Sequence, residues 1–135
     1  MNVIDPHIHL FDVELGDYGW LKPSNPPFWP DKPIINRSFN DADLNLNSLM
    51  SLSGFVHIEA GFNNAQPWLE IEWLEEQVSI PFKAIASADI TLAPNEFMIL
   101  IDKLKNYKNV VGIRHIFDDE TVDILRHKNT PINLA

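Results

Sequence analysis

The stretch GFVHIEAGFNNAQPWLEIEWLEEQV (54–78) contains one strand followed by one helix. Its first part is a short apolar run between two glycines, as is typical of a buried strand. Proline is favoured in the first turn of a helix, where its missing N–H costs nothing, and Pro67 marks such a start. Apolar residues then recur at helical spacing through Val78. The stretch therefore predicts a strand over 54–61 and a helix over 67–78.

The same order of strand and helix recurs towards the C-terminus. FKAIASAD (82–89) predicts a strand before a helix that begins at Pro94. VVGIRHIF (110–117) predicts another strand, before a helix over about 118–128. Successive strands start roughly 27 residues apart, which is the length of one unit of a parallel α/β fold. This spacing is typical of an open parallel sheet and of an eight-stranded barrel alike.

The N-terminal part is less regular. We expect a first strand over 3–11 and a first helix over 41–52, although asparagines weaken the helical pattern. Between them, PSNPPFWPDKP (23–33) holds five of the ten prolines in the chain. Proline prevents a regular helix or a central strand. Residues 12–40 are therefore predicted to form a long, ordered loop with several aromatic side chains, inserted after the first strand.

Composition restricts the class of protein. The 135 residues suit one domain, and 19 acidic against 10 basic residues give a net charge of -9. This charge disfavours binding to nucleic acid and to anionic membranes. The chain has no cysteine, no apolar run long enough for a membrane-spanning helix and no secretory signal. We therefore expect a soluble, cytoplasmic protein.

Two histidines in the predicted first strand are the strongest candidates for chemistry. In VIDPHIHLFD (3–12), alternation along a strand places Asp5, His7 and His9 on one face and apolar side chains on the other. Two imidazoles at this spacing can bind one divalent ion, with Asp5 orienting them. The alternative is that both histidines are only hydrogen-bonded, and the spacing alone does not decide between the two.

Several segments together give a resemblance to a known family. DPHIHLFD, DYGWL, VHIEAG, WLEIEWLEEQ and VVGIRHIFDDE, read in this order from Val3 to about Glu120, resemble the amidohydrolase-related family. Its members are metal-dependent TIM-barrel hydrolases that include sugar and dicarboxylate lactonases. The resemblance implies a barrel whose site lies at the C-terminal ends of the strands. The four predicted strands then correspond to the first half of a TIM barrel.

The same resemblance implies roles for the two histidines. In many members the corresponding pair, here His7 and His9, binds a divalent metal. Zinc is the expected ion for imidazole ligands, and manganese is the alternative where a carboxylate completes the site. Some lactonases of the family hold no metal tightly and use these histidines on the substrate.

Four further residues are candidates for substrate binding. His57 and Glu59 share one face of the predicted second strand, where they either line the barrel interior or form a structural pair. Arg114 presents a planar charged fork to a carboxylate or lactone oxygen, unless it forms a structural ion pair. Trp20 lies in the long loop, which in the family contributes to the walls of the pocket; ordinary loop packing is the alternative.

The resemblance also shows what a complete site requires. The family takes its remaining metal ligands and its general base from histidines on the fifth and sixth strands and an aspartate on the eighth. We therefore expect residues 1–135 to be a partial, truncated domain of a hydrolase that opens a lactone or a related ester or amide bond with metal-activated water. Its substrate would be a small lactone or carboxylate. We expect the chain alone to be inactive.

Two alternatives to this hydrolase fragment stay open. In one, two copies pair as a homodimer and share a metal site with four histidines. In the other, the chain is a non-catalytic remnant or an interaction module that keeps the fold without the chemistry.

Overall fold

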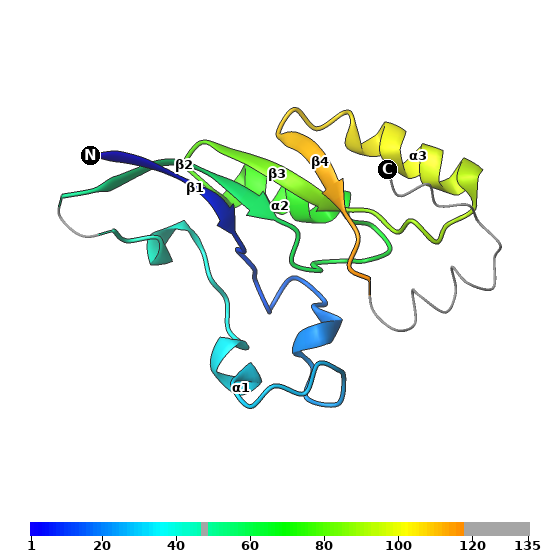
Figure 1. Cartoon of the computed structure of the whole chain (residues 1–135), viewed down its shortest axis with the longest axis horizontal. Coiled ribbons are helices and arrows are strands. Elements are labelled where there is room, and N and C mark those ends of the chain that lie inside the picture. Colours follow the sequence, from blue (N-terminus) through cyan, green and yellow to red (C-terminus); the bar gives the residue numbers. More distant parts are fainter. Residues whose placement is uncertain (47–48, 118–135) are drawn as a thin grey trace.

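The computed structural model describes residues 1–46 and 49–117, and it contains one sheet of four parallel strands in the order β1-β2-β3-β4 (Figure 1). These strands are β1 (Asn2–Ile8), β2 (Ser51–Ile58), β3 (Phe82–Ser87) and β4 (Val110–Arg114). Each strand pairs with the next along the chain, which is the arrangement of a strand-helix barrel. The predicted α/β class with four parallel strands is confirmed. The helix predicted over 118–128 lies outside the described residues.

Two helices connect the later strands and cover part of one face of the sheet. They are α2 (Trp68–Gln77) and α3 (Pro94–Leu104). Small side chains on and just after β3 allow the helices to approach closely, and the resulting core cluster consists of Ile71, Ala84, Ala86, Ala88, Leu100 and Leu104. Apolar residues of α3 recur at helical spacing and pack here: Leu100 and Leu104 belong to the cluster, and Phe97 and Ile101 lie against it.

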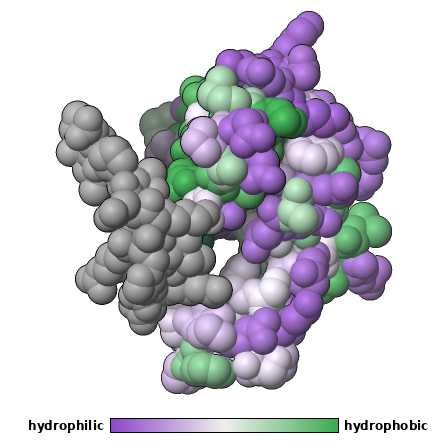
Figure 2. Space-filling model, turned by 90° about the vertical axis from the view of Figure 1, so that its right-hand side faces the viewer, coloured by the Kyte–Doolittle hydropathy of each residue, from purple (hydrophilic) through white to green (hydrophobic). Residues whose placement is uncertain are grey.

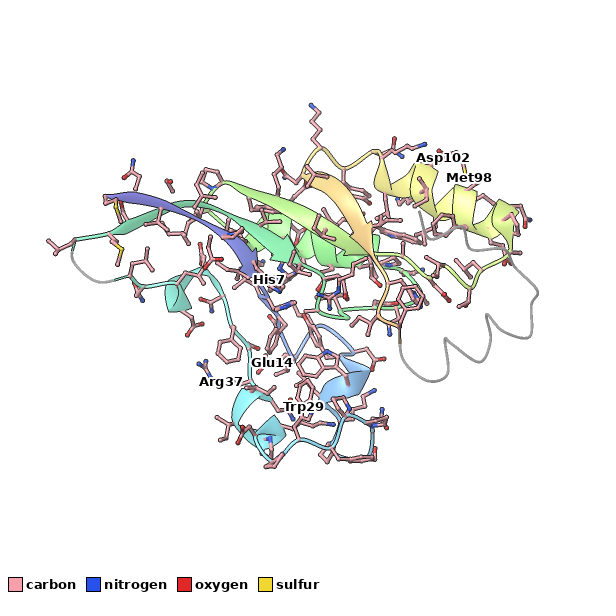
Figure 3. The ribbon with its side chains drawn as sticks, in the orientation of Figure 1. His7, Glu14, Trp29, Arg37, Met98 and Asp102 are labelled. Atoms are coloured by element: carbon pink, nitrogen blue, oxygen red, sulfur yellow. The ribbon has the colours of Figure 1, made fainter. Side chains whose placement is uncertain are left out.

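Part of the surface is apolar. Helix α3 exposes Met98, which is labelled in Figure 3, and Ile99. Figure 2, a view from the side of the molecule where α3 lies, shows hydrophobic residues among hydrophilic ones at the surface. Within 1–46 and 49–117, no helix is long and apolar enough to cross a membrane.

The long loop after β1 forms a lobe below the C-terminal end of that strand (Figure 1). It contains two short helices, η1 (Gly19–Leu21) and α1 (Lys32–Ile35). The base of the lobe is closed by an antiparallel bridge in which Phe11 N donates to Phe39 O at 3.1 Å and Phe39 N to Phe11 O at 2.8 Å. A second core cluster joins the lobe to the sheet and to α2; its buried members are Leu10, Phe11, Tyr18, Leu21, Phe55, Ala60, Phe62, Trp73 and Leu74.

The helix predicted over 41–52 is wrong. Among its described residues, 41–46 and 49–52, the one helical turn is η2 (Asp41–Asp43), and β2 already begins at Ser51. The Asn40 side chain accepts a hydrogen bond from Ala42 N at 2.9 Å, and the Asp43 side chain accepts one from Asn40 N at 3.0 Å. Asparagine and aspartate side chains that bond to nearby backbone compete with a continuing helix.

The regular alternation predicted for the first strand is also wrong in detail. Asp5 pairs with Phe55, but Ile8 pairs with His57, so the register shifts by one residue between them. Pro6 has no N–H for the ladder, and the Asp5 side chain accepts a hydrogen bond from His7 N at 2.9 Å instead. The strand ends at Ile8 rather than at 11, and β4 likewise ends at Arg114 rather than at 117.

Candidate functional site

The two histidines of the N-terminal segment meet at the C-terminal end of β1. Their Nε2 atoms lie 3.0 Å apart, and the rings contact edge to face. Two imidazoles on one tetrahedral zinc ion have their nitrogens about 3.3 Å apart. His7, labelled in Figure 3, is exposed, whereas His9 is half-buried. The 3.0 Å separation is that of a hydrogen bond between the two rings, and it is close to the separation that binding to one ion requires.

A contact with the backbone determines which nitrogen of His9 carries the proton. Its Nδ1 lies 2.9 Å from the carbonyl oxygen of Ile58, and a carbonyl only accepts, so Nδ1 carries the proton. The Nε2 of neutral His9 then has no proton, and its lone pair accepts a hydrogen bond from the Nε2–H of His7. An ion held by both Nε2 atoms would replace this proton, and the proton of neutral His7 would then be on Nδ1. A histidine whose other nitrogen is anchored on a carbonyl is typical of metal ligands.

The surroundings of His9 favour this neutral form. Burial lowers the pKa of His9 below its ordinary value of 6.5, and the hydrogen bond to Ile58 opposes that effect in part. The charges of His57, His7 and Arg114 lower the pKa further. His9 is therefore neutral at neutral pH.

The described residues do not complete a metal site. Among residues 1–46 and 49–117, no three or more histidine, cysteine, aspartate or glutamate side chains converge in a way that could hold an ion. The Asp5 carboxylate accepts the bond from His7 N noted above, which makes Asp5 a positioning residue for this turn. Two imidazole ligands fit a divalent metal, and a bound metal stays a prediction.

His57 and Glu59, predicted to share one face of the second strand, contact different charged side chains in the structure. His57 is fully buried, with its Nε2 3.3 Å from the Glu70 carboxylate of α2, while its Nδ1 accepts a hydrogen bond from Leu10 N at 3.3 Å. Glu70 also accepts a hydrogen bond from Ala60 N at 2.9 Å. His57 thus joins β1, β2 and α2 from the helix side of the sheet, which is the structural role weighed against substrate binding.

Sequence reasoning missed Glu70. It is 1% exposed, although glutamate is rarely buried. A signal was present, because Glu70 precedes the apolar residues Trp73 and Leu74 by three and four positions and therefore lies on the same helix face.

Glu59 and Arg114 are brought together from two strands that are not neighbours. Arg114 Nε lies 2.8 Å from Glu59 Oε1, and Glu59 is only 6% exposed. The N–H does not point at the oxygen, and neither atom has a hydrogen-bond partner within the described part of the chain. Burial raises the pKa of Glu59 to about 7, aided by the charge of Glu70 and opposed by that of Arg114.

Trp20 connects the loop lobe to the segment that follows β2, next to Glu59. Its indole N–H donates to Ala60 O at 2.7 Å, directly after Glu59 in the chain. Its ring also contacts those of Phe11 and Trp29. The indole N–H, the one hydrogen-bond donor of the Trp20 side chain, is thus bonded within the protein. Any contact between this side chain and a substrate would therefore involve the face or edge of the ring.

Comparisons with known proteins agree with the fold. The sequence matches no protein-family model. It is 28% identical over 134 residues to protein y4mH of Sinorhizobium fredii, covering 96% of this chain and 44% of that protein.

A solved structure, amidohydrolase 2 from Bifidobacterium longum subsp. infantis, superposes with a TM-score of 0.57 at 22% identity. The match covers 93% of this chain and 47% of that structure. The chain spans less than half the length of each of these two proteins. Its four parallel strands and interleaved helices are those of half a TIM barrel.

Proposed function

We propose that this chain contributes the His7–His9 half of a hydrolase centre that opens a lactone or a related ester or amide bond. The observation that carries the proposal is the 3.0 Å separation of the two Nε2 atoms, with His9 held in the ligand tautomer by Ile58. The likeness in fold to an amidohydrolase supports the reaction class.

Each candidate residue has a part in this proposal. A divalent metal, with zinc the expected ion and manganese the alternative, supplies Lewis acidity and lowers the pKa of bound water. His7 and His9 would hold it through Nε2, with the proton of His7 on Nδ1 instead of Nε2. Arg114, whose Nε lies 2.8 Å from Glu59 Oε1, directs its terminal N–H groups to a carboxylate or lactone oxygen of a small substrate.

The rest of the centre is proposed to come from outside the described residues. The described part of the chain offers two imidazole ligands, whereas a catalytic zinc site commonly has three protein ligands and a water. We accordingly propose that residues 1–135 alone bind metal weakly and do not hydrolyse substrate.

Titration with zinc, followed through the imidazole ¹⁵N resonances, tests the metal site. We expect the Nε2 signals of His7 and His9 to shift together while those of His57 stay in place. The double variant His7→Ala/His9→Ala should lose the response, and His115→Ala serves as the matched histidine control. Unchanged His7 and His9 resonances at millimolar zinc would contradict the proposal and favour a non-catalytic module.

A second candidate is a homodimer in which two chains share one metal through four histidines. The exposure of His7 favours it, because a second copy can approach that ring. Sedimentation velocity with and without zinc separates the two arrangements. A dimer that needs both zinc and His7 supports sharing, and a monomer at every zinc concentration removes it.

A further inference from the structure

A pocket of about 410 Å³ lies within the loop lobe, apart from the histidine pair. All of its lining comes from one short stretch of chain, residues 21–36, and includes Pro23, Phe28, Trp29, Pro30, Lys32 and Pro33. In Figure 3, Trp29 marks this part of the lobe, whereas His7 lies at the end of the sheet. The volume falls within the usual range for small-molecule sites.

The pocket contains a buried cation. Lys32 is only 5% exposed, and its ammonium donates to Asn25 O at 2.6 Å and to Lys22 O at 3.2 Å. Both acceptors are neutral carbonyls, and no carboxylate in the described ranges forms an ion pair with Lys32. An ammonium has three N–H donors, so one remains for a further acceptor. A buried charge is most stable when it has a counter-charge.

The walls around this cation are apolar and rigid. The ring of Phe28 lies 5.7 Å from the Lys32 nitrogen, yet 74% of Phe28 and 54% of Trp29 are exposed. Prolines have a fixed φ angle and lose little freedom on binding, so the pocket needs little reorganisation to accept a ligand. A flat apolar group placed against Phe28 and Trp29 would remove their rings from water.

We propose that this pocket binds a small monocarboxylate with an apolar, planar body. The carboxylate accepts the third N–H of Lys32, and the body packs against Phe28 and Trp29. One available donor suits a single negative charge, and the net charge of -9 disfavours multiply charged anions. The site is independent of the proposed hydrolase centre and of any metal.

Ligand-observed ¹⁹F NMR on the full chain tests the pocket with 4-fluorobenzoate and its neutral analogue 4-fluorobenzamide. We expect saturable broadening with the carboxylate and at least tenfold weaker binding of the amide. Equal binding of the two probes, or no binding of the carboxylate, would overturn the proposal.

Substitutions of pocket residues test whether the carboxylate binds in this pocket. Lys32→Met should remove the preference for the carboxylate, and Trp29→Ala should weaken both probes while the bonds from Lys32 to Lys22 and Asn25 stay intact. Lys83→Met is the matched control, since the Lys83 ammonium also donates to a carbonyl, that of Lys108 at 3.0 Å, but Lys83 does not line the pocket. Carboxylate binding that survives both Lys32→Met and Trp29→Ala in folded protein would refute the assignment.

Discussion

Arg114 and Glu59 form an ion pair across β3, because one residue ends β4 and the other directly follows β2. The 2.8 Å contact between Nε and Oε1 therefore links the C-terminal ends of strands that share no backbone ladder. It places a buried carboxyl group and a guanidinium at the edge of the sheet where such folds carry their chemistry.

Stability should depend on the protonation of Glu59. Its pKa rises from 4.5 to about 7 on folding, mainly through burial. A carboxyl whose pKa is raised stabilises the fold fully below about pH 4.5, and this contribution is lost as the pH rises through 7. We expect Glu59→Gln to remove a pH-dependent term of up to about 3 kcal/mol. Urea unfolding of both proteins at pH 5 and pH 7.5 measures it, and parallel pH profiles would contradict the prediction.

Removal of Arg114 should raise the pKa of the Glu59 carboxyl group further. In Arg114→Met, Glu59 loses the positive charge that lowers its pKa, so that pKa should rise above 7. A ¹³C NMR titration of the Glu59 carboxyl reports the change directly. Lys83→Met, which removes a charge elsewhere, is the control, and an unchanged Glu59 titration in Arg114→Met would show that the ion pair does not form in solution.

His57 should be needed for folding far more than His7. His57→Ala leaves Leu10 N–H without its acceptor and Glu70 without its neighbour, both in buried surroundings. We expect a loss of about 3 kcal/mol in the free energy of unfolding. The exposed His7→Ala should cost about 0.5 kcal/mol or less. Denaturant unfolding compares the two variants, and a similar small loss in both would assign His57 to function rather than to the core.

Gly16 should not accept a side chain. A Cβ atom at this position would lie 2.2 Å from Cε2 of Tyr18, whose ring is buried and whose hydroxyl accepts a hydrogen bond from Asp12 N. Gly16→Ala should therefore destabilise the protein by about 2 kcal/mol. Gly19→Ala is the control, because a Cβ there meets nothing closer than 3.9 Å. Equal melting temperatures for the two variants would contradict this packing.

Local patterns predicted the regular elements well for a physical reason. The apolar stripe of α3 and the apolar run of β3 pack directly against each other, so their periodicity reports burial. The prolines at the starts of α2 and α3 act through their own backbone and need no tertiary information.

The errors arise where distant residues decide the outcome. Alternation in β2 shows that its residues face two sides, but not that His57 meets Glu70 of a later helix. Pro6 and the Asp5 side chain shift the register of β1 against β2, and only the pairing reveals this. Within the candidate site, the proximity of His7 and His9 follows from their spacing, whereas the contact between Glu59 and Arg114 depends on the curvature of the whole sheet.

The backbone bridge between Phe11 and Phe39 has a consequence for how this protein tolerates change. The bridge brings the two ends of the loop between Phe11 and Phe39 together. For such a loop, the entropic cost of closure grows only by about 0.6 kcal/mol for each doubling of the loop length. Insertions and replacements between these two phenylalanines can therefore alter what the lobe recognises while the strand ends that hold His7 and Arg114 keep their positions. The bridge at the base of the lobe, together with the core cluster and the bond from Trp20 to Ala60, holds the lobe on the sheet.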